Sequence, residues 1–206
     1  MVARLQSQNS LTVGDALWPS DNGYDVPVLL DDLAARSVDA PVVGWGTSGR
    51  STKMRGTWHF FVDDYRFTAL LKRPHQLPAT NAVAAVEPNF TITDQMPYAE
   101  ALHRVYQKRW IARYWQSVGI KIIVDLNVSQ RYAKLNLTGV PHGWPSYATR
   151  GHNDRLHQII KEYELAKAHA GAPPLFVVYG GGRRVSDLCR ARHWLWFSEQ
   201  NKRETL

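Results

Sequence analysis

Short runs of β-prone, mostly apolar residues recur along this chain, and each run ends where polar residues or glycines begin. The runs occupy residues 57–62, 82–86, 120–124, 146–149 and 175–178. Helical patterns follow most of them. Because strands that alternate with helices are joined by right-handed crossovers, the pattern predicts an α/β fold of repeated strand-helix units. The sheet should be mainly parallel, and either open or curled into a partial barrel.

Chain length limits how far this sheet can close. A complete eight-stranded barrel takes about 250 residues, whereas this chain has 206, so a full barrel is not expected unless residues 1–56 hide further strands. Prolines and glycines punctuate that segment, which has one short helical candidate at residues 29–36. We therefore expect residues 1–55 to form an irregular lead-in packed on an α/β domain of residues 56–206. Residues 46–50 read as a loop whose small side chains could let a ligand approach the backbone.

Three helices can be delimited from local signals. The longest should run over residues 97–118, with residues 93–94 as a cap region and Gly119 at its end. A second should start at residue 153 or 154 and stop at Gly171, and a short third helix should begin at Val185. The second helix should place Leu156, Ile159, Ile160, Tyr163 and Lys167 near one side, and Lys161, Glu162 and Glu164 elsewhere.

Composition restricts the environment and the partners. No apolar run reaches the roughly 18 residues needed to span a bilayer, and the first residues lack a secretory signal, so we expect a cytoplasmic protein that does not contact membranes. The single cysteine, Cys189, excludes an internal disulfide and a thiolate metal cluster. A net charge of +7 favours contact with the phosphates of nucleic acids or nucleotides.

Four acidic residues follow the predicted strands. Ligands of parallel α/β sheets bind outside the carboxyl ends of the strands, where Asp63, Asp64, Glu87 and Asp125 are expected. These carboxylates are candidate catalytic residues, and Asp63 with Asp125 could share a Mg²⁺ ion through oxygen ligands. The alternative is that each acid caps a helix or ends a strand in solvent. His59 alternates with Phe60 along its strand and is expected to be a packed side chain.

Several cations could bind phosphate near the same edge. Arg109 and Arg113 interrupt an apolar stripe of the long helix, and Arg150 follows the fourth strand. The two helical arginines could form ion pairs with strand-end carboxylates such as Asp63 or Asp125, or they could clamp a substrate phosphate in a cleft above the sheet. Both interpretations remain open at this point.

The last strand runs into a glycine-rich turn with basic residues beside it. Gly180, Gly181 and Arg183 could hold a phosphate there, although the stretch lacks the P-loop lysine and a plain turn is the simpler interpretation. Further on, Trp194 and Trp196 lie among basic residues. Such tryptophans either dock on the body of the domain or meet a protein partner.

An ordered series of motifs resembles one known family. The motifs are WHFFVDDYRF (58–67), EPNFT (87–91), DQMP (94–97), RWIARYWQ (109–116), GVP (139–141), SYATRG (146–151) and VVYG (177–180). Together they resemble the DUF4417 proteins, which are uncharacterised and occur in bacteria, phages and mobile elements. This chain departs from the pattern at Asn89, where an aspartate is expected, and at 127–128, where an aromatic residue is expected. The resemblance implies a phage or mobile-element setting and carries no activity with it.

These observations leave functions of different classes open. The first is an enzyme that processes nucleic acid or nucleotides with strand-end acids and nearby arginines. The second is a non-enzymatic protein that binds nucleic acid or a protein partner, and the third is a virion or assembly component. The enzyme is the leading hypothesis because the polar strand ends and the basic charge point to the same edge of the sheet.

Overall fold

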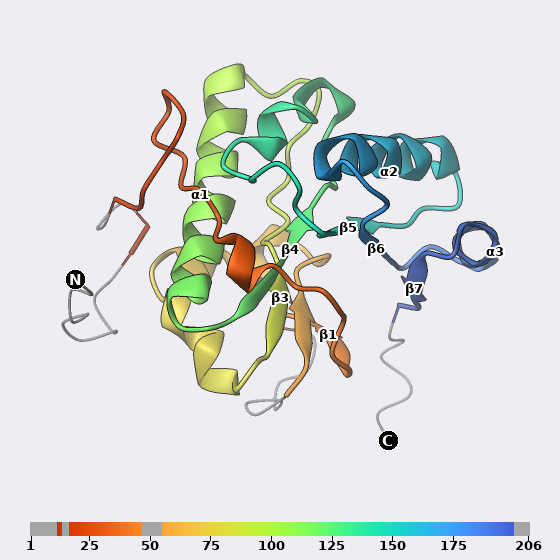
Figure 1. Cartoon of the computed structure of the whole chain (residues 1–206), viewed down its shortest axis with the longest axis horizontal. Helices are drawn as coiled ribbons and strands as arrows, with labels where there is room; N and C mark the ends of the chain where they lie inside the picture. Colours follow the sequence, from red (N-terminus) through yellow and green to blue (C-terminus); the bar gives the residue numbers. More distant parts are fainter. Residues whose placement is uncertain (1–11, 14–16, 47–54, 200–206) are drawn as a thin grey trace.

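Seven parallel strands form the single sheet of this protein in a computed structural model that describes residues 12–13, 17–46 and 55–199 (Figure 1). Their order across the sheet equals their order along the chain. The strands are β1 (Val42–Gly44), β2 (Thr57–His59), β3 (Ala84–Val86), β4 (Lys121–Asp125), β5 (Ser146–Arg150), β6 (Leu175–Tyr179) and β7 (Leu195–Phe197). The predicted α/β class with a parallel sheet is confirmed.

The sheet curls into a partial barrel. The ring of His59 on β2 lies 3.7 Å, centroid to centroid, from the ring of Tyr179 on β6, so side chains from non-adjacent strands meet on the inner face. Val86, Ile123 and Val177 fill the rest of that face. Within the described residues β1 and β7 do not pair with each other, which leaves the barrel open at this point.

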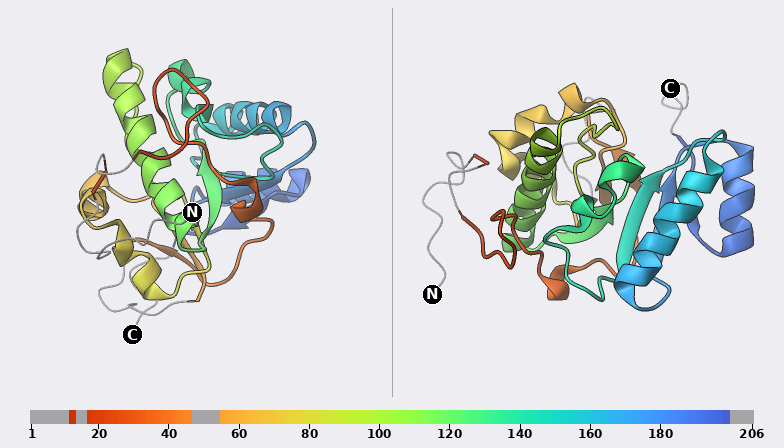
Figure 2. Two further views of the ribbon diagram at one scale, coloured as in Figure 1. Left: turned by 60° about the vertical axis from the view of Figure 1, so that its left-hand side comes forward. Right: turned by 90° about the horizontal axis from the view of Figure 1, so that it is seen from above.

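Three α-helices cover the outer face of the curved sheet. They are α1 (Tyr98–Ser117), α2 (Leu156–Ala170) and α3 (Arg183–Arg192). Helix α1 packs on β4, α2 on β5 and α3 on β7, and Figure 2 shows α1 (green) apart from α2 and α3 (blue). The remaining connections use 3₁₀ turns at Asp31–Leu33, Asp64–Arg66, Thr68–Leu71, Pro74–Gln76, Pro78–Thr80, Gln130–Tyr132 and Leu135–Leu137. Large aromatic side chains such as Phe60, Trp110 and Trp115 build the main core between helices and sheet.

Most predicted elements are present, with some corrections. β1 and β7 were not predicted, and β1 lies inside the segment that we expected to be irregular. Residues 29–36 contain only one short 3₁₀ turn, and none of the side chains expected to cap α1 and α2 does so. Gly171 ends α2 in the left-handed conformation, as predicted. Of the loop at residues 46–50, only Gly46 lies within the described residues.

The N-terminal segment packs on the sheet through backbone hydrogen bonds. The backbone of Leu30 exchanges hydrogen bonds with the side chain of Gln116, at 2.8 Å and 2.9 Å. The backbone N–H of Ala35 donates to the carbonyl of Ile122 at 2.9 Å. No described helix is long and apolar enough to cross a membrane.

Candidate functional site

A groove runs along the edge of the sheet where the parallel strands end. Its central part is a cleft of about 510 Å³. The cleft is lined by Val62, Asp63, Asp64, Tyr65, Asn89, Thr91, Asn127, Arg150, His152 and Arg155. These residues follow β2, β3, β4 and β5, which end side by side because all strands are parallel. The structure thus brings Asp63, Asp64 and Arg150 together at one edge of the sheet.

Two further clefts adjoin the central one. A cleft of about 410 Å³ shares Asn89, Asn127 and Arg155 with it. Another, of about 630 Å³, shares Arg150 and His152 with it and extends to the ends of β6 and β7. Because the clefts share lining residues, they form one elongated groove rather than isolated pockets. An elongated groove accommodates an extended ligand better than a compact one.

Two arginines, Arg150 and Arg155, line the central cleft together with two aspartates, Asp63 and Asp64. Arg150, the last residue of β5, is about one-third exposed and lies 3.4 Å from a carboxylate oxygen of Glu199. Its Nε is buried and has no hydrogen-bond partner in the described chain. The exposed side chain of Arg155 makes no hydrogen bond or ion pair with any described residue. Both arginines line the central cleft, and Arg155 is the one whose guanidinium group is exposed there without a partner in the described chain.

The two acids that follow β2 lie on this groove in different ways. Asp63 is exposed, with 72 % of its side chain accessible, and has Arg66 3.8 Å away. Asp64 accepts hydrogen bonds from the backbone N–H and the hydroxyl of Thr91, at 3.1 Å and 3.0 Å. Asp64 therefore joins the segment after β2 to the segment after β3, whereas the carboxylate of Asp63 lies largely in solvent.

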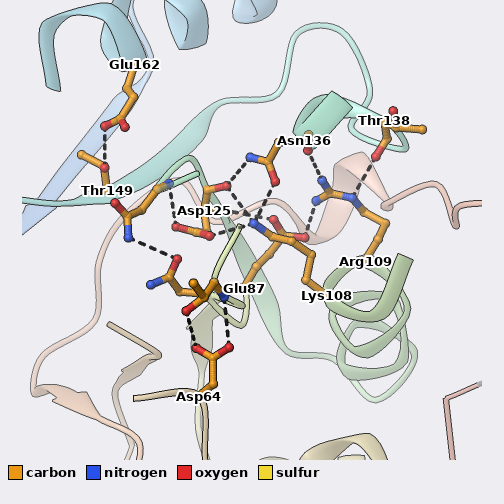
Figure 3. Close-up of polar contacts among 12 residues, drawn as sticks. Asp64, Glu87, Lys108, Arg109, Asp125, Asn136, Thr138, Thr149 and Glu162 are labelled. Carbon is orange, nitrogen blue, oxygen red and sulfur yellow. Dashed lines mark hydrogen bonds and ion pairs between the residues drawn. The ribbon is translucent and has the colours of Figure 1, made fainter. Parts of the chain in front are cut away.

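Glu87 and Asp125 are buried beneath the groove in a network of two ion pairs (Figure 3). Lys108 Nζ lies 2.7 Å from Asp125 Oδ2 and also donates to Asn136 Oδ1 at 2.9 Å. Arg109 donates to Glu87 Oε1 and, at 2.6 Å, to the carbonyl of Asn136. All four charged side chains are fully inaccessible. Burial raises the pKa of Asp125, and the charge of Lys108 opposes that rise.

This network changes the role expected for several residues. The oxygens of Asp125 are taken up by Lys108 and by the backbone N–H of Asn127, so Asp63 and Asp125 do not form a shared metal site. Among the described residues, no group of three or more His, Cys, Asp or Glu side chains could hold a metal ion. The ion-pair interpretation of Arg109 is the one found, but its partner is Glu87 rather than Asp63 or Asp125.

Arg113 does not reach the groove. Its guanidinium carbon lies 4.8 Å from the centroid of the Trp18 ring, in a cation–π contact on the N-terminal segment. Burial lowers the pKa of this side chain, and the charge of Asp32 counteracts the effect. Arg113 is therefore neither a clamp for a phosphate at the groove nor a partner of a strand-end acid.

The glycine-rich turn after β6 closes one end of the groove. Gly180 and Gly181 have φ values of +79° and +84°, and a Cβ on Gly181 would lie 2.5 Å from the Val185 side chain. Arg183 lines the cleft at this end, but its side chain is 92 % exposed, with Asp187 3.7 Å away. Glycine is therefore required at these positions by the backbone conformation and by the close packing of the turn against the start of α3.

Both tryptophans near the end of the described chain dock on the domain. Trp194 is buried against Phe176, with the ring centroids 5.0 Å apart, and against Tyr163 at 4.6 Å. The indole N–H of Trp196 donates to the carbonyl of Gly180 at 2.9 Å. Of the two interpretations, docking is the one found for these side chains.

Glu162 and His59 are titratable side chains close to the groove whose pKa values are shifted. Glu162 is buried, and it accepts hydrogen bonds from Thr149 Oγ1 at 2.6 Å and Gln158 Nε2 at 3.0 Å. Burial raises its pKa to about 7. For His59, burial and then the charge of Arg150 lower the pKa to about 3, so its ring is neutral at physiological pH. The packed position predicted for His59 is confirmed.

The sequence did not predict the burial of Lys108, Glu162 and Asn136, or the position of Arg155 on the groove. Glu162 was expected away from the core, yet it lies three residues after buried Ile159 and four before buried Ala166. Lys108 likewise follows buried Val105 by three residues and precedes buried Ala112 by four. Helical spacing to apolar neighbours was the available signal in both cases.

An open barrel of parallel strands, with a polar, arginine-lined groove at the strand ends, defines the chain as a partial-barrel α/β protein. Within that class the chain belongs to the family described as "Domain of unknown function (DUF4417)", whose sequence model matches residues 18–166. The resemblance stated from the motifs is therefore confirmed.

Phage proteins are among the relatives of the chain. It is 36 % identical over 111 residues to the "Gene 1 protein" of Mycobacterium phage D29 and 35 % identical over 111 residues to that of Mycobacterium phage L5. The aligned region covers 52 % of this chain but only 40 % and 47 % of those proteins. The chain thus spans less than half of the relatives it matches. No solved structure shows a significant match.

Proposed function

We propose that this protein binds a nucleic-acid strand or a nucleotide in the groove and processes it there. The observation that carries the proposal is the pair Arg150 and Arg155, which line the central cleft together; Arg150 is about one-third exposed, and Arg155 is exposed without a partner in the described chain. Guanidinium groups are well suited to phosphate because their N–H donors match the spacing of its oxygens. The relatives are phage proteins, so the proposed setting is the cytoplasm of an infected bacterium.

Asp63 is the carboxylate that supports a chemical step best. Glu87 and Asp125 are held in buried ion pairs, and Asp64 is engaged by Thr91, whereas Asp63 is largely exposed on the groove. It could accept a proton from an attacking water. Mg²⁺ often binds through one or two carboxylates together with substrate phosphates. Asp63 fits that type of site better than an all-protein one, since the described residues offer no larger ligand group.

Binding without catalysis is the second candidate. It is favoured by the withdrawal of two strand-end acids, Glu87 and Asp125, into ion pairs that leave them inaccessible to a ligand. The two candidates share the groove and differ only in whether the bound strand or nucleotide is changed.

Salt-dependent binding tests the shared part of the proposal. The affinity of labelled single-stranded DNA, RNA and nucleotides is measured by fluorescence anisotropy over a salt series for the wild type and for Arg150→Ala/Arg155→Ala. We expect the double variant to bind about tenfold or more weakly and to lose about one to two in the slope of log affinity against log salt. Arg190→Ala is the control, because Arg190 is 81 % exposed and lies outside the groove.

The same substrates incubated with Mg²⁺ or Mn²⁺ separate the two candidates. Products that form with the wild type and fail to form with Asp63→Asn support the enzyme. Unchanged substrates despite tight, salt-sensitive binding support the binding protein. Equal affinity of the double variant and the wild type, or an affinity that does not change with salt, would contradict both.

A further inference from the structure

Two asparagines stand side by side on the wall of the groove. Asn89 follows β3 and Asn127 follows β4, and these strands are neighbours in the sheet. Asn127 Nδ2 donates a hydrogen bond to Asn89 Oδ1 at 3.2 Å. Both residues line the central cleft and the 410 Å³ cleft next to it. The amide pair, meaning Asn89 and Asn127 together, therefore borders the part of the groove that also contains Arg155.

The buried ion pairs hold this amide pair in place. The backbone N–H of Asn127 donates to Asp125 Oδ1 at 3.0 Å, and Asp125 Oδ2 is fixed by Lys108. Glu87 Oε2 accepts from the backbone N–H of Asp125 at 3.2 Å, and only Pro88 separates Glu87 from Asn89. Both asparagines are thus anchored to inaccessible charged groups. A side chain anchored in this way keeps its orientation before a ligand arrives.

Each amide keeps one polar group without a partner in the described chain. Asn89 is only 9 % exposed, yet its NH₂ group donates to no described residue. Asn127 Oδ1 likewise accepts no hydrogen bond from one. Both atoms are accessible in the cleft, so a ligand that supplies a complementary acceptor and donor can reach them.

We propose that Asn89 and Asn127 recognise the hydrogen-bonding edge of one unpaired nucleobase, while Arg150 and Arg155 hold the adjoining phosphates. The inference rests on the proposed function, and it names what the groove recognises. Unpaired bases present acceptors next to amino or imino donors, and asparagine amides recognise such edges. Inorganic phosphate has no such base edge, and a sugar chain has no phosphate, so neither offers both features to the groove.

Asn89→Asp tests the pair with minimal change of shape. The carboxylate can still accept the hydrogen bond from Asn127 Nδ2, but the donor that faces the groove becomes an acceptor. The affinities of four homotrinucleotides are measured for the wild type and the variant, each divided by the affinity of an abasic trinucleotide. This ratio cancels the repulsion between the new charge and the phosphates. Circular dichroism and thermal melting verify that the variant is folded.

We expect the wild type to bind at least one base about tenfold more tightly than the abasic trinucleotide. In Asn89→Asp that preference should fall several-fold, and guanine should gain relative to the other bases, because its N1–H and N2 amino group are adjacent donors. Asn81→Asp is the control, since this exposed asparagine precedes β3 at the opposite edge of the sheet. The control should keep the wild-type order of bases.

The failures of the two proposals are distinguishable. If the abasic trinucleotide binds as tightly as all four others, or if Asn89→Asp keeps the order of bases, the amide pair does not read a base. The proposed function survives that result as long as Arg150→Ala/Arg155→Ala still weakens binding of the abasic trinucleotide. If no trinucleotide binds to the wild type, the proposed function itself is wrong.

Discussion

The acids after β2 and the acids at the ends of β3 and β4 occupy similar places in the sequence but opposite environments. Asp63 is 72 % exposed, whereas Glu87 and Asp125 are fully buried. The difference comes from what covers each strand end. Helix α1 packs on β4 and brings Lys108 and Arg109 to the acids, while β2 is followed by the 3₁₀ turn Asp64–Arg66. A strand-end acid is thus a groove residue only where no basic helix faces it.

The largest expected effect comes from removing one partner of a buried ion pair. Lys108→Met leaves Asp125 inaccessible and without a cation, so the free energy of unfolding should fall by about 3–5 kcal/mol. Urea denaturation followed by circular dichroism measures this change. The matched control, Asp63→Asn, should stay within about 0.5 kcal/mol of the wild type because its carboxylate is in solvent. Equal losses in the two variants would contradict the contrast between the two groups of acids.

Glu162 adds a third case to this comparison of acids. It is buried like Glu87 and Asp125, but it is held by hydrogen bonds rather than by an ion pair. Its pKa is about 7 in the folded protein and 4.5 in its ordinary state. The folded state therefore binds the proton of Glu162 more tightly than the unfolded state does. The stabilisation that comes from this group is fully present below pH 4.5 and is lost as the pH rises through 7. This decline should amount to about 3 kcal/mol for the group.

Denaturation at pH 5 and at pH 8 measures that contribution. Glu162→Gln should lose most of the decline, and Glu164→Gln should keep it because Glu164 is exposed on the same helix. A wild type and a Glu162→Gln variant with the same pH dependence would mean that Glu162 ionises as an ordinary carboxyl.

The fold could be predicted from sequence further than the site could, for a physical reason. Residues 97–118 predict α1 through the proline at their start and Gly119 after their end, and residues 120–124 predict β4 through their β-branched content. The three-residue strands β1 and β7 carry little such signal, since they exist through pairing with β2 and β6. Pairing joins residues far apart in sequence, which local patterns do not encode.

The candidate site shows the same limit. The sequence places Asp63, Asp64 and Arg150 at strand ends, and the groove contains them. It does not reveal that Lys108 is buried opposite Asp125, because a lysine on a helix is normally expected in solvent. The amide pair was visible only as a departure from the family pattern. Its position follows from the ion pairs beneath it, which involve residues 17 or more positions apart.

The smallest expected change in the free energy of unfolding concerns Asp63 and Asp64, the two acids that follow β2. Asp64→Ala removes both hydrogen bonds to Thr91 and should lower the free energy of unfolding by about 1 kcal/mol, because each such bond contributes little when water can replace it. Asp63→Ala should have almost no effect on stability, since its ion pair with Arg66 is loose and exposed. Asp63 and Asp64 are adjacent but share no partner, so the double variant should lose the sum of the single losses. If Asp63→Ala lost more stability than Asp64→Ala, Asp63 would be the acid that joins the segments around the groove. The chemical role proposed for Asp63 would then pass to Asp64.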